Sequence, residues 1–214
     1  FQTHYGHTIG AVWGDVDHDG DLDVFHANLA HPRFFDFSDL ATLYINGGGP
    51  NPVFTDVGAE IGIRYQETPS NPNFIDYDND GDLDLFYTCV YAARPSQFYR
   101  NDGHPAWKEV SYPTGVAVLN GWGSVVADID QDGKMDLLMS QGDNLEYGHG
   151  WPQPYHGVIW LKNQGNWKFE GQQIGHLGGA YGTAATDVDG DGDTDVVIVS
   201  MSNDYANPRN PSII

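Results

Sequence analysis

The sequence is poor in basic residues and lacks long apolar runs, and these two shortages exclude two kinds of partner. Lysine and arginine together number 9 against 30 aspartates and glutamates, which gives the 214 residues a formal net charge of −21. Nucleic acids and anionic membrane surfaces bind basic protein surface, so no nucleic-acid partner is expected. No apolar stretch approaches the roughly 18 residues that a membrane-spanning helix needs, so no membrane insertion is expected either.

Cysteine is nearly absent. The single thiol, Cys89, allows no internal disulfide and no zinc or haem motif built on cysteine. Its apolar neighbours predict a small buried residue in a strand. The chain begins at Phe1 without a methionine or a recognisable leader, so we expect a mature or truncated piece of a longer protein.

Aspartate, by contrast, is abundant, and it is concentrated in four copies of one nine-residue motif. The copies read DVDHDGDLD at 15–23, DYDNDGDLD at 76–84, DIDQDGKMD at 128–136 and DVDGDGDTD at 187–195. Each has Asp at positions 1, 3, 5 and 9 and Gly at position 6, and together they hold nineteen of the 30 acidic residues. We call them aspartate loops 1 to 4.

The chemistry of these loops is that of a hard cation. Calcium takes six to eight oxygen ligands, which alternate residues of a tight loop can supply, with a further carbonyl from position 7. Without a cation, two carboxylates about 5 Å apart repel by roughly 3 kcal/mol at an effective dielectric constant of about 20. We therefore expect up to four Ca²⁺ ions with a structural role; the alternative is an aspartate-rich turn without metal.

The residues expected at these sites include one exception to the acidic pattern. They are Asp15, Asp17, Asp19, Asp21, Asp23, Asp76, Asp78, Asp80, Asp82, Asp84, Asp128, Asp130, Asp132, Lys134, Asp136, Asp187, Asp189, Asp191, Asp193 and Asp195. Lys134 occupies position 7 of loop 3. Because that position binds through its carbonyl oxygen, we expect loop 3 to bind calcium more weakly rather than not at all.

An EF-hand also begins D-x-D-x-D-G, but it requires a bidentate glutamate at position 12. The residues found there are His26, Tyr87, Met139 and Ile198. The flanking segments are rich in β-formers rather than helical, so the EF-hand is excluded.

The segments around the loops predict strands. Each loop is preceded by a short apolar segment and followed by a strong β-former run such as LDLFYTCV, and Asn-Gly, Asn-Asp-Gly or Asn-Gln-Gly then separates two further strands. The loops start 61, 52 and 59 residues apart, so each unit is a four-stranded antiparallel meander in which the aspartate loop joins the first two strands. The expected blades are 9–58, 73–112, 122–171 and an incomplete 181–200. A polar tail, or the start of a further strand, follows at 201–214. The fold class is all-β: a β-propeller, or a segment of one.

The pattern aromatic-Gly-x-x-x-x-Asp-x-Asp-x-Asp-Gly-x-x-Asp-Leu resembles the FG-GAP/VCBS repeat of integrin α chains and bacterial surface proteins. Trp122-Gly123 and Tyr181-Gly182 stand at its aromatic-Gly pair. LYINGGGPNPVFTDVGAEIGI with NFIDYDNDGDLDLFY is also similar to repeats of cartilage-acidic-protein and UnbV-like proteins. The resemblance implies calcium sites saturated by protein oxygens, and a ring with further blades from the same or another chain. A small four-bladed ring, closed with help from residues 1–8, is the alternative.

If the aspartate loops share one face, the long connections 26–40, 90–97 and 141–157 lie on the other. Their aromatic and basic residues form a candidate ligand face: Arg33, Phe34, Tyr91, Arg94, Tyr147, His149, Trp151, Tyr155 and His156. The alternative is that these aromatics cover the blade edges and pack among themselves. Four histidines of the same face, at positions 4, 7, 26 and 31, could hold a transition metal or simply be solvated.

The function that follows is a recognition, adhesion or structural assembly module that binds a glycan or a protein. Because cytosolic free calcium is too low to fill ordinary sites of this kind, we expect an extracellular, cell-surface or periplasmic location. The alternative is a lyase-like enzyme acting on polysaccharides, with a Tyr or His base and Arg94 neutralising a uronate. No G-x-S-x-G, phosphate-binding Gly-rich loop or H-E-x-x-H supports catalysis, so no catalytic residue is assigned.

Overall fold

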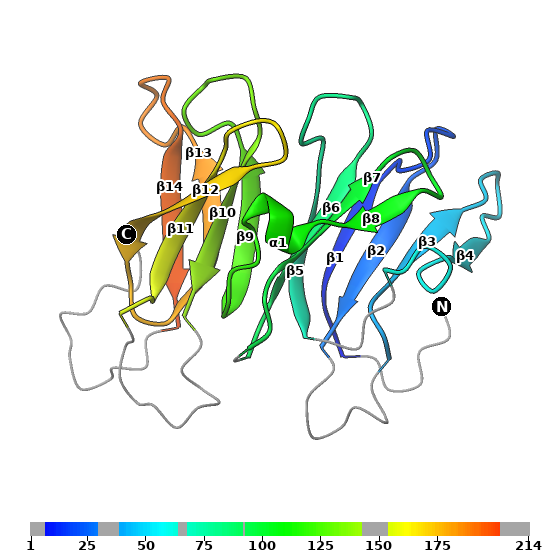
Figure 1. The fold of residues 1–214 in the computed structure, drawn as a ribbon, viewed down its shortest axis with the longest axis horizontal. Coiled ribbons are helices and arrows are strands. Elements are labelled where there is room, and N and C mark those ends of the chain that lie inside the picture. Colours follow the sequence, from blue (N-terminus) through cyan, green and yellow to red (C-terminus); the bar gives the residue numbers. More distant parts are fainter. Residues whose placement is uncertain (1–6, 30–38, 64–67, 92, 143–153, 202–214) are drawn as a thin grey trace.

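The chain folds into four antiparallel β-sheets with almost no helix (Figure 1). The computed structural model describes residues 7–29, 39–63, 68–91, 93–142 and 154–201. In this part of the chain, three sheets have four strands and the fourth has two. The all-β prediction is confirmed, and no described helix is long and apolar enough to cross a membrane.

The strands follow one another through the sheets in chain order. Sheet 1 consists of β1 (Thr8–Gly14), β2 (Asp23–Asn28), β3 (Thr42–Asn46) and β4 (Phe54–Asp56). Sheet 2 consists of β5 (Pro69–Ile75), β6 (Asp84–Cys89), β7 (Gln97–Asn101) and β8 (Trp107–Glu109). Sheet 3 consists of β9 (Gly121–Ala127), β10 (Asp136–Gln141), β11 (Gly157–Asn163) and β12 (Phe169–His176). Sheet 4 consists of β13 (Ala180–Thr186) and β14 (Asp195–Ser200).

Each sheet is an up-and-down meander, because every strand pairs with its neighbour in the sequence. An aspartate loop joins the first two strands of each sheet, as the motif spacing predicts. One short helix, α1 (Ser111–Thr114), connects sheets 2 and 3 and ends at Gly115, whose φ of 90° is left-handed. The sequence pattern did not predict this turn of helix.

The sheets stand side by side in chain order, and a hydrophobic core fills each space between neighbours (Figure 1). Between sheets 1 and 2, the rings of Phe25 and Tyr87 stack at 5.3 Å. Between sheets 2 and 3, Phe86 packs with Leu137, and between sheets 3 and 4, Leu138 packs with Ile198. The second strands β2, β6 and β10 are buried along their whole length.

The first strands of consecutive sheets run close together, and glycine permits the approach. A Cβ at Gly10 would lie 2.2 Å from the carbonyl oxygen of Ser70 in β5. A Cβ at Gly123 would lie 2.8 Å from the carbonyl oxygen of Tyr181 in β13. The glycine of the aromatic-Gly pair in β9 is therefore required by the contact between two backbones.

Candidate metal centres

All four aspartate loops emerge from the same edge of the row of sheets (Figure 1). Their backbones share one conformation. The residue at position 4 has a φ near +60° in the first three loops: 61° at His18, 59° at Asn79 and 58° at Gln131. The glycine at position 6 has a φ between 86° and 98° in every loop. Two left-handed residues so close together coil each loop tightly, which turns alternate side chains toward the loop interior.

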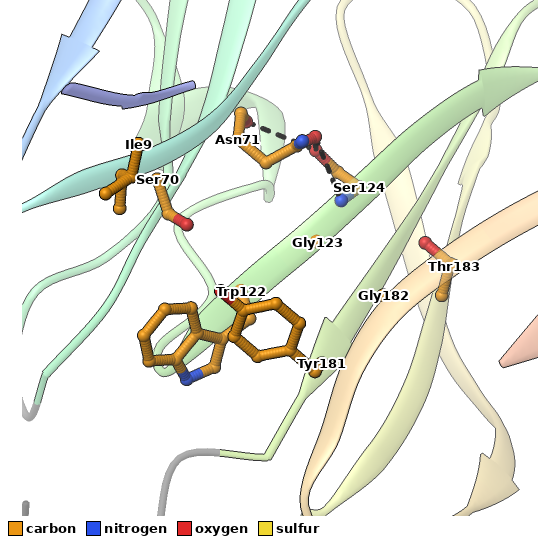
Figure 2. A pocket seen from close by; sticks show the side chains of 9 residues that line it. All are labelled: Ile9, Ser70, Asn71, Trp122, Gly123, Ser124, Tyr181, Gly182 and Thr183. Carbon is orange, nitrogen blue, oxygen red and sulfur yellow. Dashed lines mark hydrogen bonds between the residues drawn. The ribbon is translucent and has the colours of Figure 1, made fainter. Parts of the chain in front are cut away.

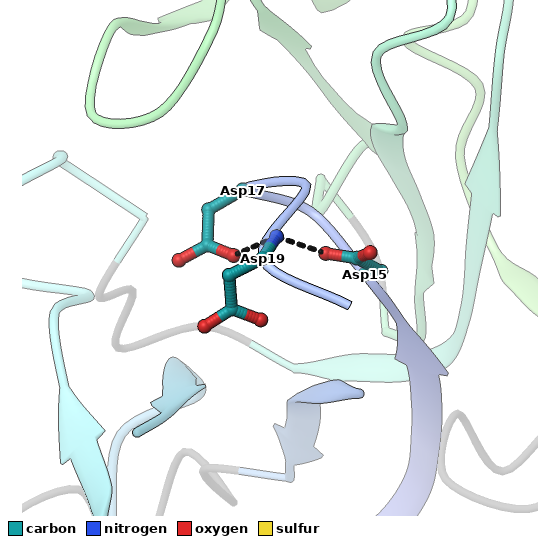
Figure 3. Close-up of side chains that lie close together, drawn as sticks. All are labelled: Asp15, Asp17 and Asp19. Atoms are coloured by element: carbon teal, nitrogen blue, oxygen red, sulfur yellow. Dashed lines mark hydrogen bonds between the residues drawn. The ribbon is translucent and has the colours of Figure 1, made fainter. Parts of the chain in front are cut away.

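The carboxylate at position 1 closes the loop. In loop 1, Asp15 accepts hydrogen bonds from the backbone N–H of Asp19 at 3.1 Å and of Gly20 at 3.0 Å. The N–H of Asp19 is also 3.3 Å from a carboxylate oxygen of Asp17, and Figure 3 shows the three side chains around this N–H. Loops 2 and 3 repeat the two bonds to position 1, so the coiled shape is encoded within the nine residues.

The carboxylate at position 9 ties the loop to its sheet. Asp84 accepts the backbone N–H of Tyr77 at 3.2 Å and that of Asn101, at the end of β7, at 2.9 Å. Asp23 and Asp136 make the same pair of contacts in sheets 1 and 3. Burial raises the pKa of Asp84 to about 8, and it raises the pKa of Asp23 and Asp136 as well. Burial disfavours the charged form of these three carboxyl groups, and a nearby cation would stabilise that form.

In each loop, three carboxylates converge. Their oxygens lie within 4.8 Å of one another, and the four sets are Asp15, Asp17 and Asp19; Asp76, Asp78 and Asp80; Asp128, Asp130 and Asp136; Asp187, Asp189 and Asp195. Two oxygens on opposite sides of a calcium ion, each about 2.4 Å from it, are about 4.8 Å apart. An all-oxygen donor set of this size therefore fits a hard cation such as Ca²⁺.

Not every aspartate of the motif joins these sets. The side chains at position 7, which are Asp21, Asp82, Lys134 and Asp193, lie outside them, as do Asp23, Asp84, Asp132 and Asp191. Asp82 instead contacts His18 of the neighbouring loop 1, with 2.8 Å between a carboxylate oxygen and Nε2, and this hydrogen bond raises the pKa of His18. Position 4 thus reaches from one loop to the next, a contact that the motif alone does not predict.

Loop 3 differs from its sisters because it carries its own cations. The ammonium of Lys134 lies 2.8 Å from Asp132, and this hydrogen bond holds the pKa of Asp132 below its usual range. The ammonium of Lys162, in β11, forms an ion pair with Asp130 and lies 3.9 Å from Asp132. Sequence reasoning singled out Lys134 but missed Lys162, which lies 26 residues beyond the loop and reaches it only because β11 pairs with β10.

Four residues of the candidate ligand face can be placed: Tyr91, Arg94, Tyr155 and His156. Tyr91 is buried against Leu29 and Val90. His156 is only 1% exposed, and burial lowers its pKa, whereas its neighbour Tyr155 is 38% exposed and meets its ring edge to face at 4.9 Å. Arg94 is half-buried just before β7. The other five fall outside the described residues: Arg33, Phe34, Tyr147, His149 and Trp151.

The histidines considered for a transition metal are not brought together among the residues that the structure describes. His26 is 7% exposed and stacks on the ring of Tyr44 at 5.4 Å, which places it in the packing of sheet 1. His7 is exposed, and positions 4 and 31 are outside the described ranges. The convergent carboxylate sets of the described chain contain no histidine.

Comparison with known proteins agrees with the repeat. A model of the FG-GAP-like repeat family matches residues 76–139, from the start of loop 2 to β10. Cartilage acidic protein 1 of Xenopus tropicalis is 28% identical over 187 residues, which cover 76% of this chain and 24% of that protein. The Mus musculus protein is 26% identical over 161 residues, covering 65% and 21%, and the Homo sapiens protein is 25% identical over 162 residues, with the same coverage. The chain spans about a fifth to a quarter of the length of these curated relatives. Residues 76–139 therefore carry an FG-GAP-like repeat, and the chain is similar in sequence to cartilage acidic protein 1, in line with the resemblance that its aspartate loops indicate.

Proposed function

We propose that the chain is a calcium-stabilised segment of a β-propeller that serves as an extracellular recognition or assembly module. The observation that carries the proposal is a three-carboxylate cluster in every aspartate loop at the same edge of four sheets, built on positions 1 and 3 with position 5 in loops 1 and 2 and position 9 in loops 3 and 4. A single acidic cluster is common on protein surfaces. Four clusters on loops with the same left-handed glycine at position 6, three of them tied to the third strand of their sheet through position 9, are best explained by a bound ion.

The propeller geometry is supported by how the sheets repeat. Antiparallel sheets placed one after another, each burying a core against the next, match the radial repetition of propeller blades. The residue at position 2 of loops 1 to 3 packs in the core between its own sheet and the following one, so its exposure shows whether a sheet covers it. Val16 is 0% exposed and Tyr77 is 1% exposed, whereas Val188 of loop 4 is 64% exposed. An additional blade beside sheet 4, from the same or another chain, would cover Val188.

Calcium would act on stability rather than on a reaction. Each ion would neutralise carboxylates that otherwise repel one another and would be bound only by the folded loop, so its binding energy would add to the free energy of unfolding. At a free concentration one hundred times the Kd, one site contributes about 2.7 kcal/mol. In this stabilising role the calcium ion would neutralise the carboxylate charges, and the aspartates would bind the ion.

The test is the calcium dependence of thermal unfolding. We expect EDTA to lower the Tm sharply and added Ca²⁺ to restore it. Asp17→Asn keeps the shape of a clustered side chain but removes its charge, so it should reduce both the bound calcium, measured by equilibrium dialysis, and the calcium-induced rise in Tm. Glu170→Gln, an exposed change on β12, is the matched control and should leave both unchanged. An identical melt with and without EDTA, together with no bound calcium, would refute the assignment.

The recognition role rests on the arrangement of the two edges. The aspartate loops lie at one edge of the sheets, and β2, β6 and β10 end at the opposite edge (Figure 1). The connections that follow these strands in the sequence begin there, and loops on a rigid scaffold commonly carry binding residues. A glycan or a protein is the proposed ligand there. An extracytoplasmic location follows from the calcium proposal, because the sites need free calcium well above cytosolic levels. Secretion of the full-length protein with its sites filled would support it, and exclusive cytosolic recovery would contradict it.

A further inference from the structure

The first strands of all four sheets converge on one small cavity. It has a volume of about 180 Å³, and its walls come from β1, β5, β9 and β13 (Figure 2). Ile9 stands on one side, Asn71 and Ser124 on another, and the rings of Trp122 and Tyr181 on a third. A site lined by four sequence-distant strands is a product of the fold, and the motif analysis did not single it out.

An aromatic pair forms one wall of this cavity. The ring centroids of Trp122 and Tyr181 are 4.8 Å apart and the planes are tilted by 35°, so the two rings pack against each other (Figure 2). Tyr181 is 40% exposed, so part of its ring surface is accessible to a ligand. The pair presents apolar ring surface to whatever enters the cavity.

The wall is held rigidly. Trp122 packs against the buried cluster of Leu29, Val90 and Tyr91 on its other side. Its carbonyl accepts a hydrogen bond from the hydroxyl of Thr88 at 2.7 Å, and the next N–H, of Gly123, donates to Ser140 at 2.9 Å. The ring is therefore set in place before any ligand arrives, which reduces the entropy cost of binding.

Polar groups with unused hydrogen-bonding capacity surround the wall. The buried hydroxyl of Thr183 has no hydrogen-bond partner among the residues that the structure describes. The amide oxygen of Asn71 accepts from the N–H and the hydroxyl of Ser124 at 3.1 and 2.9 Å, which fixes the side chain and leaves its NH₂ group to donate elsewhere. A buried hydroxyl without a partner is costly, so a ligand that hydrogen-bonded to it would stabilise the site.

We propose that the cavity binds one neutral pyranose ring of a glycan. An engineered apolar protein cavity of about 150 Å³ binds benzene, so a volume of about 180 Å³ is large enough for one six-membered ring. A pyranose presents an apolar C–H face for Trp122 and Tyr181 and hydroxyl groups for Thr183 and Asn71. The net charge of −21 disfavours uronates and sulfated sugars, which selects a neutral ring.

This site specifies the ligand class of the proposed recognition role, and it does not depend on the calcium assignment. The test is saturation-transfer-difference NMR on the 214-residue chain in calcium buffer, with the methyl pyranosides of glucose, galactose, mannose and N-acetylglucosamine as probes. We expect transfer to the ring C–H protons of at least one of them, with a Kd on the order of 1 mM, and none to the methyl glycoside of glucuronic acid.

Two variants locate the binding. Tyr181→Ala removes half of the aromatic wall and should weaken binding by about tenfold or more. Thr183→Val keeps the shape and β-propensity of the side chain but removes its hydroxyl, so it should weaken binding while leaving the Tm equal or higher. Tyr112→Ala, at an exposed ring on α1 away from the cavity, is the control and should bind as the wild type does.

The outcomes separate this proposal from the calcium role. No transfer from any neutral pyranoside at about 10 mM, well above the expected Kd, would overturn it. So would equal transfer in the wild type, Tyr181→Ala and Thr183→Val. Sugar binding that persists in EDTA, with an unchanged melt, would support this site and refute calcium stabilisation.

Discussion

The side-chain amide of Asn101 donates a hydrogen bond to the backbone carbonyl of Val16 at 3.0 Å, which joins the end of β7 in sheet 2 to aspartate loop 1 of sheet 1. The backbone N–H of the same residue donates to Asp84 of loop 2. Asn163 repeats the arrangement one sheet later, donating to the carbonyl of Tyr77 at 3.0 Å and to Asp136. The asparagines that end β7 and β11 thus each link two successive loops.

The first prediction concerns this link. Asn101→Ala and Asn163→Ala remove the donor to a buried carbonyl at sites that are 1% and 0% exposed, so each should lower the free energy of unfolding by about 2 kcal/mol. Asn46 is the matched control, because its amide bonds within its own sheet, to Leu22 at 3.1 Å, at an exposed place. Asn46→Ala should cost less than half as much in urea unfolding. Equal losses at all three positions would mean that the contact between sheets contributes nothing of its own.

The second prediction concerns loop 3. Lys162→Met keeps most of the side chain's length but removes the ammonium that pairs with Asp130, so Ca²⁺ no longer competes with a resident positive charge. We expect the calcium affinity of this loop to rise by roughly fivefold, and the stability in EDTA to fall slightly because a partly exposed ion pair contributes little. Isothermal titration calorimetry with Ca²⁺ measures the change.

Lys108→Met is the control for that experiment, because Lys108 lies exposed on β8. A similar rise in affinity for both variants would reflect only the change in net charge. A fall in affinity for Lys162→Met would show that the lysine assists the ion rather than replacing it.

Much of the fold could be predicted from the sequence because its signals are local. The nine residues of each aspartate loop carry their own turn chemistry, from the glycine at position 6 to the carboxylate of Asp15 that closes the coil. The strands on either side are β-rich and short, and Asn-Gly and related pairs mark the hairpins between the third and fourth strands. Strand order within each sheet then follows from adjacency in the chain.

Contacts between sheets could not be predicted in this way. The pairing of Lys162 with loop 3, the bond from Asn101 to Val16 and the cavity wall formed by Trp122 and Tyr181 join residues 32 to 85 positions apart. Nothing in a local pattern specifies which side chains meet across a packed interface. The motif also does not predict that the carboxylate at position 9 is buried and accepts a hydrogen bond from the third strand, as Asp84 does from Asn101.

The third prediction concerns the buried imidazole of His156. Its Nδ1 accepts the N–H of Gly179 at 3.3 Å, its Nε2 has no partner among the described residues, and burial lowers its pKa below 6.5. The folded state therefore favours the neutral ring. The stabilisation is fully present above pH 6.5 and is lost as the pH falls through 6.5 toward the folded pKa, at up to about 1.4 kcal/mol per pH unit.

His156→Asn retains an acceptor for Gly179 but cannot take up a proton, so we expect its free energy of unfolding to be lower at pH 8 and to fall less between pH 8 and pH 5. Burial raises the pKa of Asp23, Asp84 and Asp136 and lowers that of His26, but these groups are the same in both proteins. The difference between the two sets of urea-unfolding curves therefore isolates His156. His176→Asn, an exposed change at the end of β12, should keep the wild-type pH dependence. If the free energy of unfolding of His156→Asn falls in parallel with that of the wild type as the pH falls, protonation of the His156 ring is not what destabilises the folded state.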